Sequence, residues 1–421
     1  MSIRVLIVSE NISMKMGGES SLPFYYAKLL QRRGVKVILA SHARVQEEVR
    51  AAFSEPDFEL HFVQDTQSQK ALYNIGERIG ARAKVTITEQ AIHLITQMRI
   101  RRLACQLADE GKIDVVLEPA PITPKGVSLM YRVGVPVVIG PLCGGMSFPP
   151  AFRNYDSVLT RVLVDGVRRV SGAVHKALPG KLYADTILVA NEQTRHALPK
   201  AVKGRILQVF ESGVDLEIWK PQPDDRVSGD SVVRFAFSGW FKDWKGIRFL
   251  VSAFSKIATT EKNCELHLIG GGELEQDLKS QVRTAGIESK VHFHGWLDRT
   301  AAADILRDTD VFVMPSLREC GGTAILEAMA LGKPVIATRW GGPADYLNPS
   351  CGILVEPSSP EAFVDGLADA MTRLARSQDL RKSLGAGGIA RVQQDYLDWE
   401  SKADRVLDVL RDVVDRRNNR P

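Results

Sequence analysis

The sequence predicts an α/β protein built from two open parallel sheets, each with helices on both faces. In the first half, apolar runs such as "RVLIVS" and "VKVILAS" alternate with amphipathic stretches such as "SSLPFYYAKLLQRRG", which is the pattern of βαβ units. The alternation lapses in the polar, turn-rich stretch "ESGVDLEIWKPQPDDRVSGD" and then begins again. A chain of 421 residues therefore divides into two domains of similar architecture.

The first domain is predicted at residues 1–210, followed by a linker at 211–222. Its strands are expected at the two runs above and at "IDVVLE" and "VPVVIG", and its first helix is expected to end at Gly34. Uninterrupted apolar runs of this kind are typical of parallel strands that are covered on both faces.

The second domain is predicted at residues 223–395. Its strands are expected at "VVRFAFSG", "CELHLIG", "VHFHG", "DVFVMPS" and "PVIAT", and the tail at 396–421 is a charged amphipathic helix. Two such domains facing each other leave a cleft between the carboxyl ends of their strands, where sheets of this type bind ligands.

Composition excludes several other classes of protein. With 44% apolar and 25% charged residues, the chain can bury large cores and is not disordered. The apolar run in "MSIRVLIVSE" is too short for a secretory signal, and no run of 18 or more apolar residues predicts a transmembrane helix. We therefore expect a cytoplasmic protein.

The net charge of +5 comes from the first half, because the second half is net acidic. Segments 98–108 and 160–181 mix Arg and Lys with apolar residues, a composition that suits anionic lipid at the inner face of a membrane. The alternative is a core-facing helix with a solvated basic edge, and the sequence leaves both open. Neither segment carries interleaved aromatics, so no nucleic-acid partner is predicted.

The stretch 316–342, "SLRECGGTAILEAMALGKPVIATRWGG", places a glycine turn between a buried strand and a helix expected at 323–331. Gly321, Gly322 and Thr323 present backbone N–H groups at the start of that helix, where unpaired N–H groups and the helix dipole attract a phosphate or a sugar oxygen.

Two carboxylates flank this turn. Glu319 precedes the helix, and Glu327 lies one turn beyond Thr323 on the same face. A carboxylate accepts two hydrogen bonds at once and therefore pairs well with vicinal hydroxyls. The alternative is an ordinary capped helix with a partly exposed glutamate.

The segment 319–342 resembles the E-x7-E region of retaining glycosyltransferases with the GT-B fold, the group 1 or family 4 type. The resemblance continues in "SGWFKDWKGIRFLVSAF", "LHLIGGGE", "GILVEP" and "GVDLEIWKP", and more weakly in "MGGES". It implies two facing Rossmann-like domains with a cleft between them, the first on the acceptor side, the second binding the donor, and the C-terminal helix packing back on the first. The implied reaction moves a sugar, with retention, from a nucleotide diphosphate sugar to a glycan or lipid-linked hydroxyl in exopolysaccharide, lipopolysaccharide or other glycoconjugate assembly.

The resemblance also implies roles at the turn. Glu319 matches the glutamate that contacts hydroxyls of the donor sugar, and Glu327 matches the one that holds the ribose. Gly321, Gly322 and Thr323 match positions whose backbone amides reach the sugar and phosphate.

Further donor-binding residues follow from the G-R-x-x-x-x-K-G pattern and from the first glycine turn. Lys245 matches a lysine on the diphosphate that stabilises the leaving group, which makes it the second catalytic residue beside Glu319. Gly17, Gly18 and Gly239 match positions where the backbone approaches the donor. No cofactor or metal is implied, because the nucleotide sugar is itself a co-substrate.

Three departures from the family pattern concern the donor chemistry. Trp240 replaces the expected arginine beside Gly239, and we expect Arg318 to supply the missing charge or Trp240 to stack on a sugar or base. Gly321 stands where an aromatic residue is frequent, and the loop "GPLCGGMSFPP" has no histidine. The alternative functions are a non-catalytic nucleotide-sugar-binding homologue and a nucleotide-sugar 2-epimerase.

Two other patterns are not interpreted as metal sites. The motif "DTD" at 308–310 leads into a strand, so Asp310 is expected to begin that strand. His292 and His294 alternate along a strand and are expected on one of its faces rather than around a metal. Nearby Trp296 either borders the base or belongs to the core.

Overall fold

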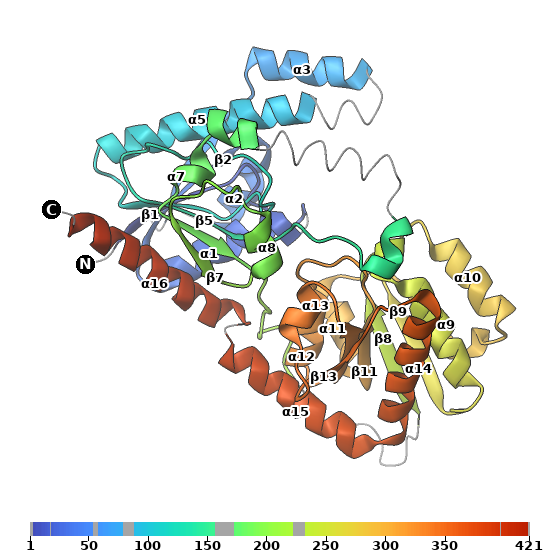
Figure 1. Cartoon of the computed structure of the whole chain (residues 1–421). Helices are drawn as coiled ribbons and strands as arrows, with labels where there is room; N and C mark the ends of the chain where they lie inside the picture. The colour runs from blue at the N-terminus through green and yellow to red at the C-terminus, as the bar shows by residue number, and fades with distance from the viewer. Residues whose placement is uncertain are drawn as a thin grey trace. The chain divides into compact units, whose positions relative to one another are not determined.

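The computed structural model describes residues 3–16, 18–53, 58–78, 88–155, 172–221, 232–395 and 397–419. The chain forms two compact units, each built around its own parallel sheet (Figure 1). Unit 1 comprises Met1–Gly145, Val164–Glu211 and Lys402–Pro421, and unit 2 comprises Met146–Leu163 and Ser212–Ser401. The predicted α/β class with two parallel sheets is confirmed.

Unit 1 contains a seven-stranded sheet of order β3-β2-β1-β4-β5-β6-β7. Its strands are β1 (Arg4–Val8), β2 (Lys36–His42), β3 (Phe58–Val63), β4 (Val115–Glu118), β5 (Val137–Leu142), β6 (Thr186–Val189) and β7 (Arg205–Gln208). Its helices include α1 (Gly18–Arg32), α2 (Gln46–Ala52), α3 (Gln67–Arg78), α5 (Glu89–Asp109), α7 (Gly180–Tyr183) and α8 (Glu192–Ala197). The strand order reverses between β1 and β4, which makes their carboxyl ends the natural ligand position of this sheet.

The central strands of unit 1 are buried, as continuous apolar runs predict. Leu6 of β1 pairs with Ile38 of β2, and both side chains are fully buried in the core of the unit. Helix α1 ends at Arg32, and Gly34 then adopts a φ of +75°, which explains the glycine at this position.

The long C-terminal helix α16 (Trp399–Asn418) belongs to unit 1 from Lys402 onward. The buried Lys402 Nζ donates a hydrogen bond to the Phe210 carbonyl over 2.6 Å. Two ion pairs follow along the helix, Arg33 with Asp404 and Arg205 with Asp412. The first turn of α16 therefore fixes the helix more firmly than these partly exposed ion pairs do.

Unit 2 contains a six-stranded parallel sheet of order β10-β9-β8-β11-β12-β13. Its strands are β8 (Val233–Ser238), β9 (Cys264–Ile269), β10 (Val291–Gly295), β11 (Val311–Met314), β12 (Val335–Thr338) and β13 (Gly352–Val355). Its helices include α9 (Ile247–Ala258), α10 (Glu275–Thr284), α11 (Arg299–Arg307), α12 (Thr323–Ala330), α13 (Gly342–Tyr346), α14 (Pro360–Arg376) and α15 (Gln378–Gln394). Here the order reverses between β8 and β11, so the loops after these two strands occupy the ligand position.

Residues 146–155 pack with unit 2, although the sequence analysis placed them in the first domain. Their short helix η3 (Pro150–Tyr155) buries Phe152 against the rings of Phe249 and Phe363, with ring centroids 5.5 and 5.9 Å apart. These edge-to-face aromatic contacts explain the assignment, because they form part of the core of unit 2.

Segment 98–108 lies in α5, and segment 160–181 falls partly outside the described residues. Ile100, Ala104 and Leu107 of α5 are buried in the core of unit 1, while Arg101 donates hydrogen bonds to the Tyr131 carbonyl. In this segment the helix faces the core and carries a basic edge. None of the described helices combines the length and apolar character needed to cross a membrane.

Candidate active site

The predicted glycine turn connects β11 to α12 at the carboxyl edge of the unit 2 sheet. Gly322 precedes the first helical residue, Thr323, and adopts a φ of +99°. A Cβ atom at Gly322 would also lie 3.3 Å from Glu319 Cγ, so the turn favours glycine on both conformational and steric grounds. The neighbouring Gly321 is buried.

The two predicted catalytic side chains meet beside this turn. Lys245 ends the short helix η4 (Asp243–Lys245) after β8, and its Nζ donates a hydrogen bond to Oε2 of Glu319. Ser316 Oγ lies 3.3 Å from the same oxygen. Because only 14% and 15% of the Lys245 and Glu319 side chains are exposed, this ion pair is stronger than one at an open surface.

Backbone contacts hold the Lys245 loop against the turn. The amides of Leu317 and Arg318 both donate to the Trp244 carbonyl, at 2.8 and 3.3 Å. Gly246 has a φ of +67°, and a Cβ atom there would lie 1.9 Å from the Pro315 carbonyl oxygen. Only glycine permits this approach, which explains why Lys245 is followed by a glycine.

Glu327 lies on α12, one turn beyond Thr323, with a partly buried side chain. Desolvation raises the pKa of its carboxyl to about 7, and the positive charge of Arg299 offsets only part of this effect. No residue in the described part of the chain hydrogen-bonds its carboxyl group. A ligand hydroxyl would therefore meet an acceptor whose hydrogen-bonding capacity is unused.

Two tryptophans form an exposed wall at the carboxyl ends of β8 and β10. Trp240 follows Gly239, whose amide donates to the Ile269 carbonyl, and Trp296 follows β10. Their ring centroids are 4.5 Å apart, and the side chains are 53% and 57% exposed. The alternative that Trp296 is a core aromatic is therefore wrong.

Two cations, Arg318 and Lys242, lie over aromatic rings in this region. Arg318 lies over the rings of Phe148 and Trp244, with its guanidinium carbon 4.9 and 5.9 Å from their centroids. Lys242 Nζ lies 5.6 Å from the Trp240 ring and 4.7 Å from the Trp244 ring. Sequence analysis missed Lys242, although it occupies a variable position of the same G-x-x-x-x-x-K-G pattern.

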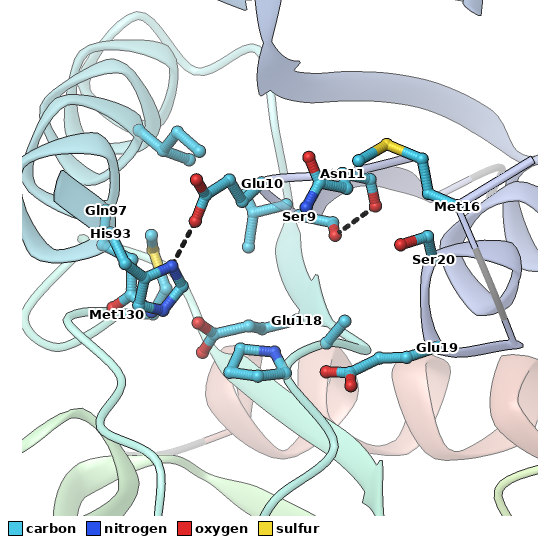
Figure 2. A pocket seen from close by; sticks show the side chains of 14 residues that line it. Ser9, Glu10, Asn11, Met16, Glu19, Ser20, His93, Gln97, Glu118 and Met130 are labelled. Carbon is cyan, nitrogen blue, oxygen red and sulfur yellow. Dashed lines mark hydrogen bonds and ion pairs between the residues drawn. The ribbon is translucent and has the colours of Figure 1, made fainter. Parts of the chain in front are cut away.

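The remaining predicted donor residues belong to unit 1. Gly17 lies outside the described residues, and Gly18 begins α1 with no atom within 4 Å of the position that a Cβ would take. A cavity of about 290 Å³, lined in part by Glu19 and Ser20 of α1, lies at the carboxyl ends of β1 and β4. Figure 2 shows its polar lining: His93 Nδ1 hydrogen-bonds to Glu10, and Glu118 and Glu19 lie nearby.

Two carboxyl groups of this cavity, those of Glu10 and Glu118, have shifted pKa values. Burial alone would raise the pKa of Glu10, but the hydrogen bond from His93 and the charge of Arg44 hold it below its ordinary value. Burial raises the pKa of Glu118 to about 7, against the opposing hydrogen bond that Ser128 Oγ donates over 2.5 Å. Clustered carboxyl groups with shifted pKa values at a strand edge are typical of a site that binds polar ligands.

The DTD motif and the histidines of β10, which the sequence analysis did not interpret as metal sites, have different surroundings in unit 2. Asp310 precedes β11, and its Oδ2 accepts a hydrogen bond from the Arg234 amide over 2.8 Å, which fixes the start of the strand. His292 and His294 share one face of β10, as predicted, and His267 on β9 lies beside both. Burial and the two neighbouring histidines lower the pKa of His267 to about 4, so its imidazole is neutral at neutral pH.

Residues 224–389 match the model of the family described as "Glycosyl transferases group 1". The matched residues contain both the Lys245 loop and the glycine turn, and the resemblance drawn from these motifs is thereby confirmed. Residues 224–389 are therefore similar to the domain that defines group 1 glycosyltransferases.

Curated relatives match over part of their length. A GDP-mannose-dependent monoacylated α-(1-6)-phosphatidylinositol monomannoside mannosyltransferase of Corynebacterium glutamicum is 28% identical over 214 residues, 47% of this chain and 54% of the relative. The lipopolysaccharide core biosynthesis glycosyltransferase LpsE of Rhizobium meliloti is 32% identical over 151 residues, 36% of this chain and 42% of the relative. The chain thus spans about half the length of these relatives.

Solved structures match over almost the whole chain. Anabaena HepE, crystallised with UDP and glucose, has a TM-score of 0.62 at 17% identity and covers 97% of this chain and 99% of its own. The sucrose-phosphate synthase of Thermosynechococcus elongatus has a TM-score of 0.65 at 18% identity, covering 98% and 99%. At such identities the likeness shows the fold, and that fold is GT-B.

Proposed function

We propose that this protein is a retaining, metal-independent glycosyltransferase that moves a hexose from a nucleotide diphosphate sugar to a hydroxyl acceptor. The observation that carries the proposal is the pairing of Lys245 with Glu319 beside the start of α12. The matched family model and the names of the curated relatives support the same class of reaction.

The arrangement in unit 2 suits the two ends of such a donor. Lys245 offers a cation to the diphosphate, which stabilises the negative charge that develops as the nucleotide leaves. The carboxylate of Glu319 is then released to accept hydrogen bonds from sugar hydroxyls, and the carboxyl of Glu327 accepts those of the ribose. Because lysine supplies the positive charge, the proposed mechanism needs no metal on the diphosphate.

In this proposal Lys242 supplies a second positive charge for the diphosphate. The family pattern has an arginine where Trp240 stands, and the Lys242 ammonium lies over that tryptophan ring instead. We assign Lys242 as the second cation for the diphosphate, with the exposed Trp240 and Trp296 rings as stacking surfaces for base or sugar.

The acceptor is assigned to the cavity of unit 1. Its carboxyl groups, Glu10, Glu19 and Glu118, can accept hydrogen bonds from the hydroxyls of a glycan. The relatives named for phosphatidylinositol mannoside and lipopolysaccharide core substrates support a lipid-linked acceptor in glycoconjugate assembly, met at the inner face of a membrane. In the proposed mechanism the attacking hydroxyl passes its proton to a departing phosphate oxygen.

Thermal unfolding with UDP, GDP, ADP and dTDP tests the donor assignment. One nucleotide, at about 100 times its dissociation constant, should stabilise the protein by about 2.7 kcal/mol. Lys245→Ala should lose most of this effect. The matched control is Lys256→Ala, because Lys256 forms an exposed ion pair with Asp365 in the same unit. Equal stabilisation of all three proteins would refute the assignment.

Turnover then separates the proposal from its alternatives. With the identified sugar nucleotide and lipid-linked acceptors, a transferase releases nucleotide only when an acceptor is present, and proton NMR gives the anomeric configuration of its product. Conversion of the sugar nucleotide to its 2-epimer without acceptor would establish the epimerase. Nucleotide binding without turnover on any acceptor would establish the non-catalytic homologue.

A further inference from the structure

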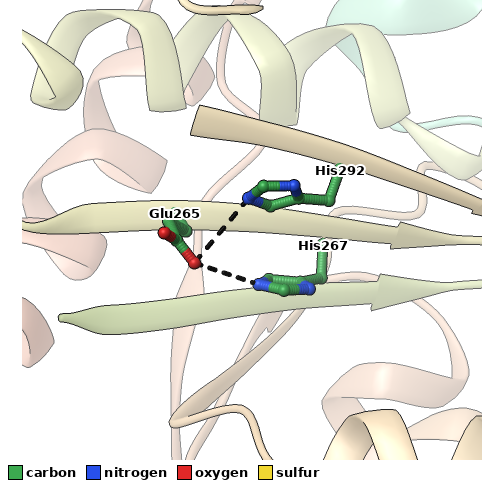
Figure 3. Close-up of side chains that lie close together, drawn as sticks. All are labelled: Glu265, His267 and His292. Atoms are coloured by element: carbon green, nitrogen blue, oxygen red, sulfur yellow. Dashed lines mark ion pairs between the residues drawn. The ribbon is translucent and has the colours of Figure 1, made fainter. Parts of the chain in front are cut away.

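Three potential metal ligands gather on one face of unit 2, at the edge of its sheet. Glu265 and His267 alternate along β9, and His292 of the edge strand β10 pairs in register with His267. Alternate residues of a strand share a face, so all three side chains project from the same side (Figure 3).

The donor atoms converge on a small space. Nε2 of His267 lies 3.5 Å from Oε2 of Glu265, and Nε2 of His292 lies 3.7 Å from the same oxygen. All three donor atoms lie within 4.8 Å of one another. In a tetrahedral site with bonds of about 2.0–2.1 Å, ligand atoms are about 3.3 Å apart, so small side-chain shifts would close this set around a cation.

A second observation also favours a ligand between these side chains. The Nε2 atoms of His267 and His292 are buried, and neither forms a hydrogen bond in the described part of the chain. Buried polar atoms are almost always hydrogen-bonded, because an unsatisfied one loses its hydration without compensation. A cation held between these two lone pairs and the carboxylate would satisfy both nitrogens at once.

The surroundings also fix the orientation of one imidazole ring. Nδ1 of His267 lies 3.0 Å from Nε2 of His294, and the two rings are within 10° of parallel. When Nδ1 of His267 carries the proton and donates to His294, its Nε2 lone pair is left free on the side of Glu265. Metal-binding histidines are characteristically held by such a hydrogen bond from the other ring nitrogen.

We propose that Glu265, His267 and His292 bind one divalent transition-metal cation, Zn²⁺ by the character of the ligands, with water in the fourth position. The cation would join the edge strand β10 to β9 and so brace the loop that carries Trp296, as the Gly270 amide does by donating to the Gly295 carbonyl. The three ligands are separate from the residues assigned to the proposed sugar transfer.

The neighbouring Arg234 should weaken binding of the cation, so its removal should change zinc affinity in the opposite direction from the removal of a ligand. Arg234 on β8 places its Nε 3.6 Å from Oε2 of Glu265, so it competes for the same carboxylate oxygen. Removing this positive charge by Arg234→Gln should tighten zinc binding, whereas the loss of a ligand should weaken it.

The experiment is isothermal titration of ZnCl₂ into the full chain after treatment with EDTA, with zinc content measured by mass spectrometry. Wild type should bind one equivalent of zinc. The zinc affinity of His292→Ala should fall by more than the roughly 10–100-fold that is typical when an outer-shell partner of a metal ligand is removed. His61→Ala is the matched control, because His61 hydrogen-bonds to Glu59 on the edge strand of unit 1 and no third ligand joins them among the described residues. It should bind zinc as wild type does.

Cobalt gives a readout that does not depend on stability. Co²⁺ bound at this site should show the visible absorption of a four-coordinate complex, and His267→Gln and His292→Gln should each abolish it. Zinc uptake that is absent, or that is unchanged in both histidine variants while circular dichroism shows them folded, overturns the proposal. If thiols such as Cys351 bound the zinc instead, uptake would be the same in wild type and in both histidine variants.

Discussion

The raised pKa of Glu327 makes the stability of unit 2 depend on pH in a way that one substitution removes. Burial raises this pKa from 4.5 to about 7, so the folded protein holds the proton more tightly than the unfolded chain does. The stabilisation from this proton is complete below about pH 4.5 and is lost as the pH rises through 7. Glu327→Gln keeps the shape of the side chain and removes the titration.

The size of the effect follows from the separation of the two pKa values. At 1.36 kcal/mol per pH unit, a group moved from 4.5 to about 7 contributes at most about 3 kcal/mol. Because the Glu327 side chain is only partly buried, water screens part of this and we expect about 1–3 kcal/mol. The Glu327→Gln variant should therefore exceed wild type in stability at pH 8 and lose that advantage near pH 5.

Urea unfolding followed by tryptophan fluorescence at pH 5, 6, 7 and 8 measures this difference. Comparing the two proteins at each pH cancels other titrating groups, including Glu118, which is unchanged between them. Glu356→Gln, at an exposed residue paired with Arg339, is the control and should give a difference nearly independent of pH. A constant difference for Glu327→Gln, or one that falls with pH, would refute the assignment of a desolvated carboxyl. The same variant should lose nucleotide stabilisation at pH 8, because an amide accepts fewer hydrogen bonds from ribose hydroxyls.

Two further predictions concern the Lys245 loop. Gly246→Ala should destabilise the protein by about 3 kcal/mol or more in urea unfolding. The control is Gly286→Ala, which has a nearly equal φ of +66° but no atom within 4 Å and should lose only about 1 kcal/mol. Equal losses would show that the close approach of the loop is not the reason for the glycine. Lys242→Ala should weaken binding of the identified nucleoside diphosphate by roughly 10–150-fold in isothermal titration, as expected for one charged hydrogen bond. An unchanged affinity in Lys242→Ala would remove Lys242 from the proposed site.

Much of the fold could be predicted from sequence because local patterns determine it. Continuous apolar runs became buried parallel strands, and Gly34 closed α1 with a positive φ. The glycine turn before α12 was predictable for the same reason, since few residues other than glycine adopt the conformation of Gly322.

The site was less predictable where it depends on contacts between distant residues. Glu319 and Lys245 are 74 positions apart, and the pairing of β8 with β11, together with the backbone bonds between Trp244 and the turn, brings them together. His267 and His292 became neighbours through the register of β9 with β10, which no spacing within one strand reveals. Trp296 illustrates a related limit, because a tryptophan after a strand can equally enter a core or line a surface.

Folding alone does not account for the combination of groups at the carboxyl edge of the unit 2 sheet. Large aromatic rings at Trp240 and Trp296 remain half exposed, although burying either would stabilise the unit. Glu327 keeps a carboxyl group where desolvation opposes its charge, and a neutral residue would fit the helix at less cost. Lys245 donates a hydrogen bond to Glu319. A ligand with a diphosphate and vicinal hydroxyls could bind both of these groups in place of that bond. The exposed tryptophans and the desolvated Glu327 lower stability or leave it unimproved, and all of these groups lie where a parallel sheet binds its ligand. Their coincidence at one edge is a stronger reason to assign a nucleotide-sugar site than any one of these residues taken separately.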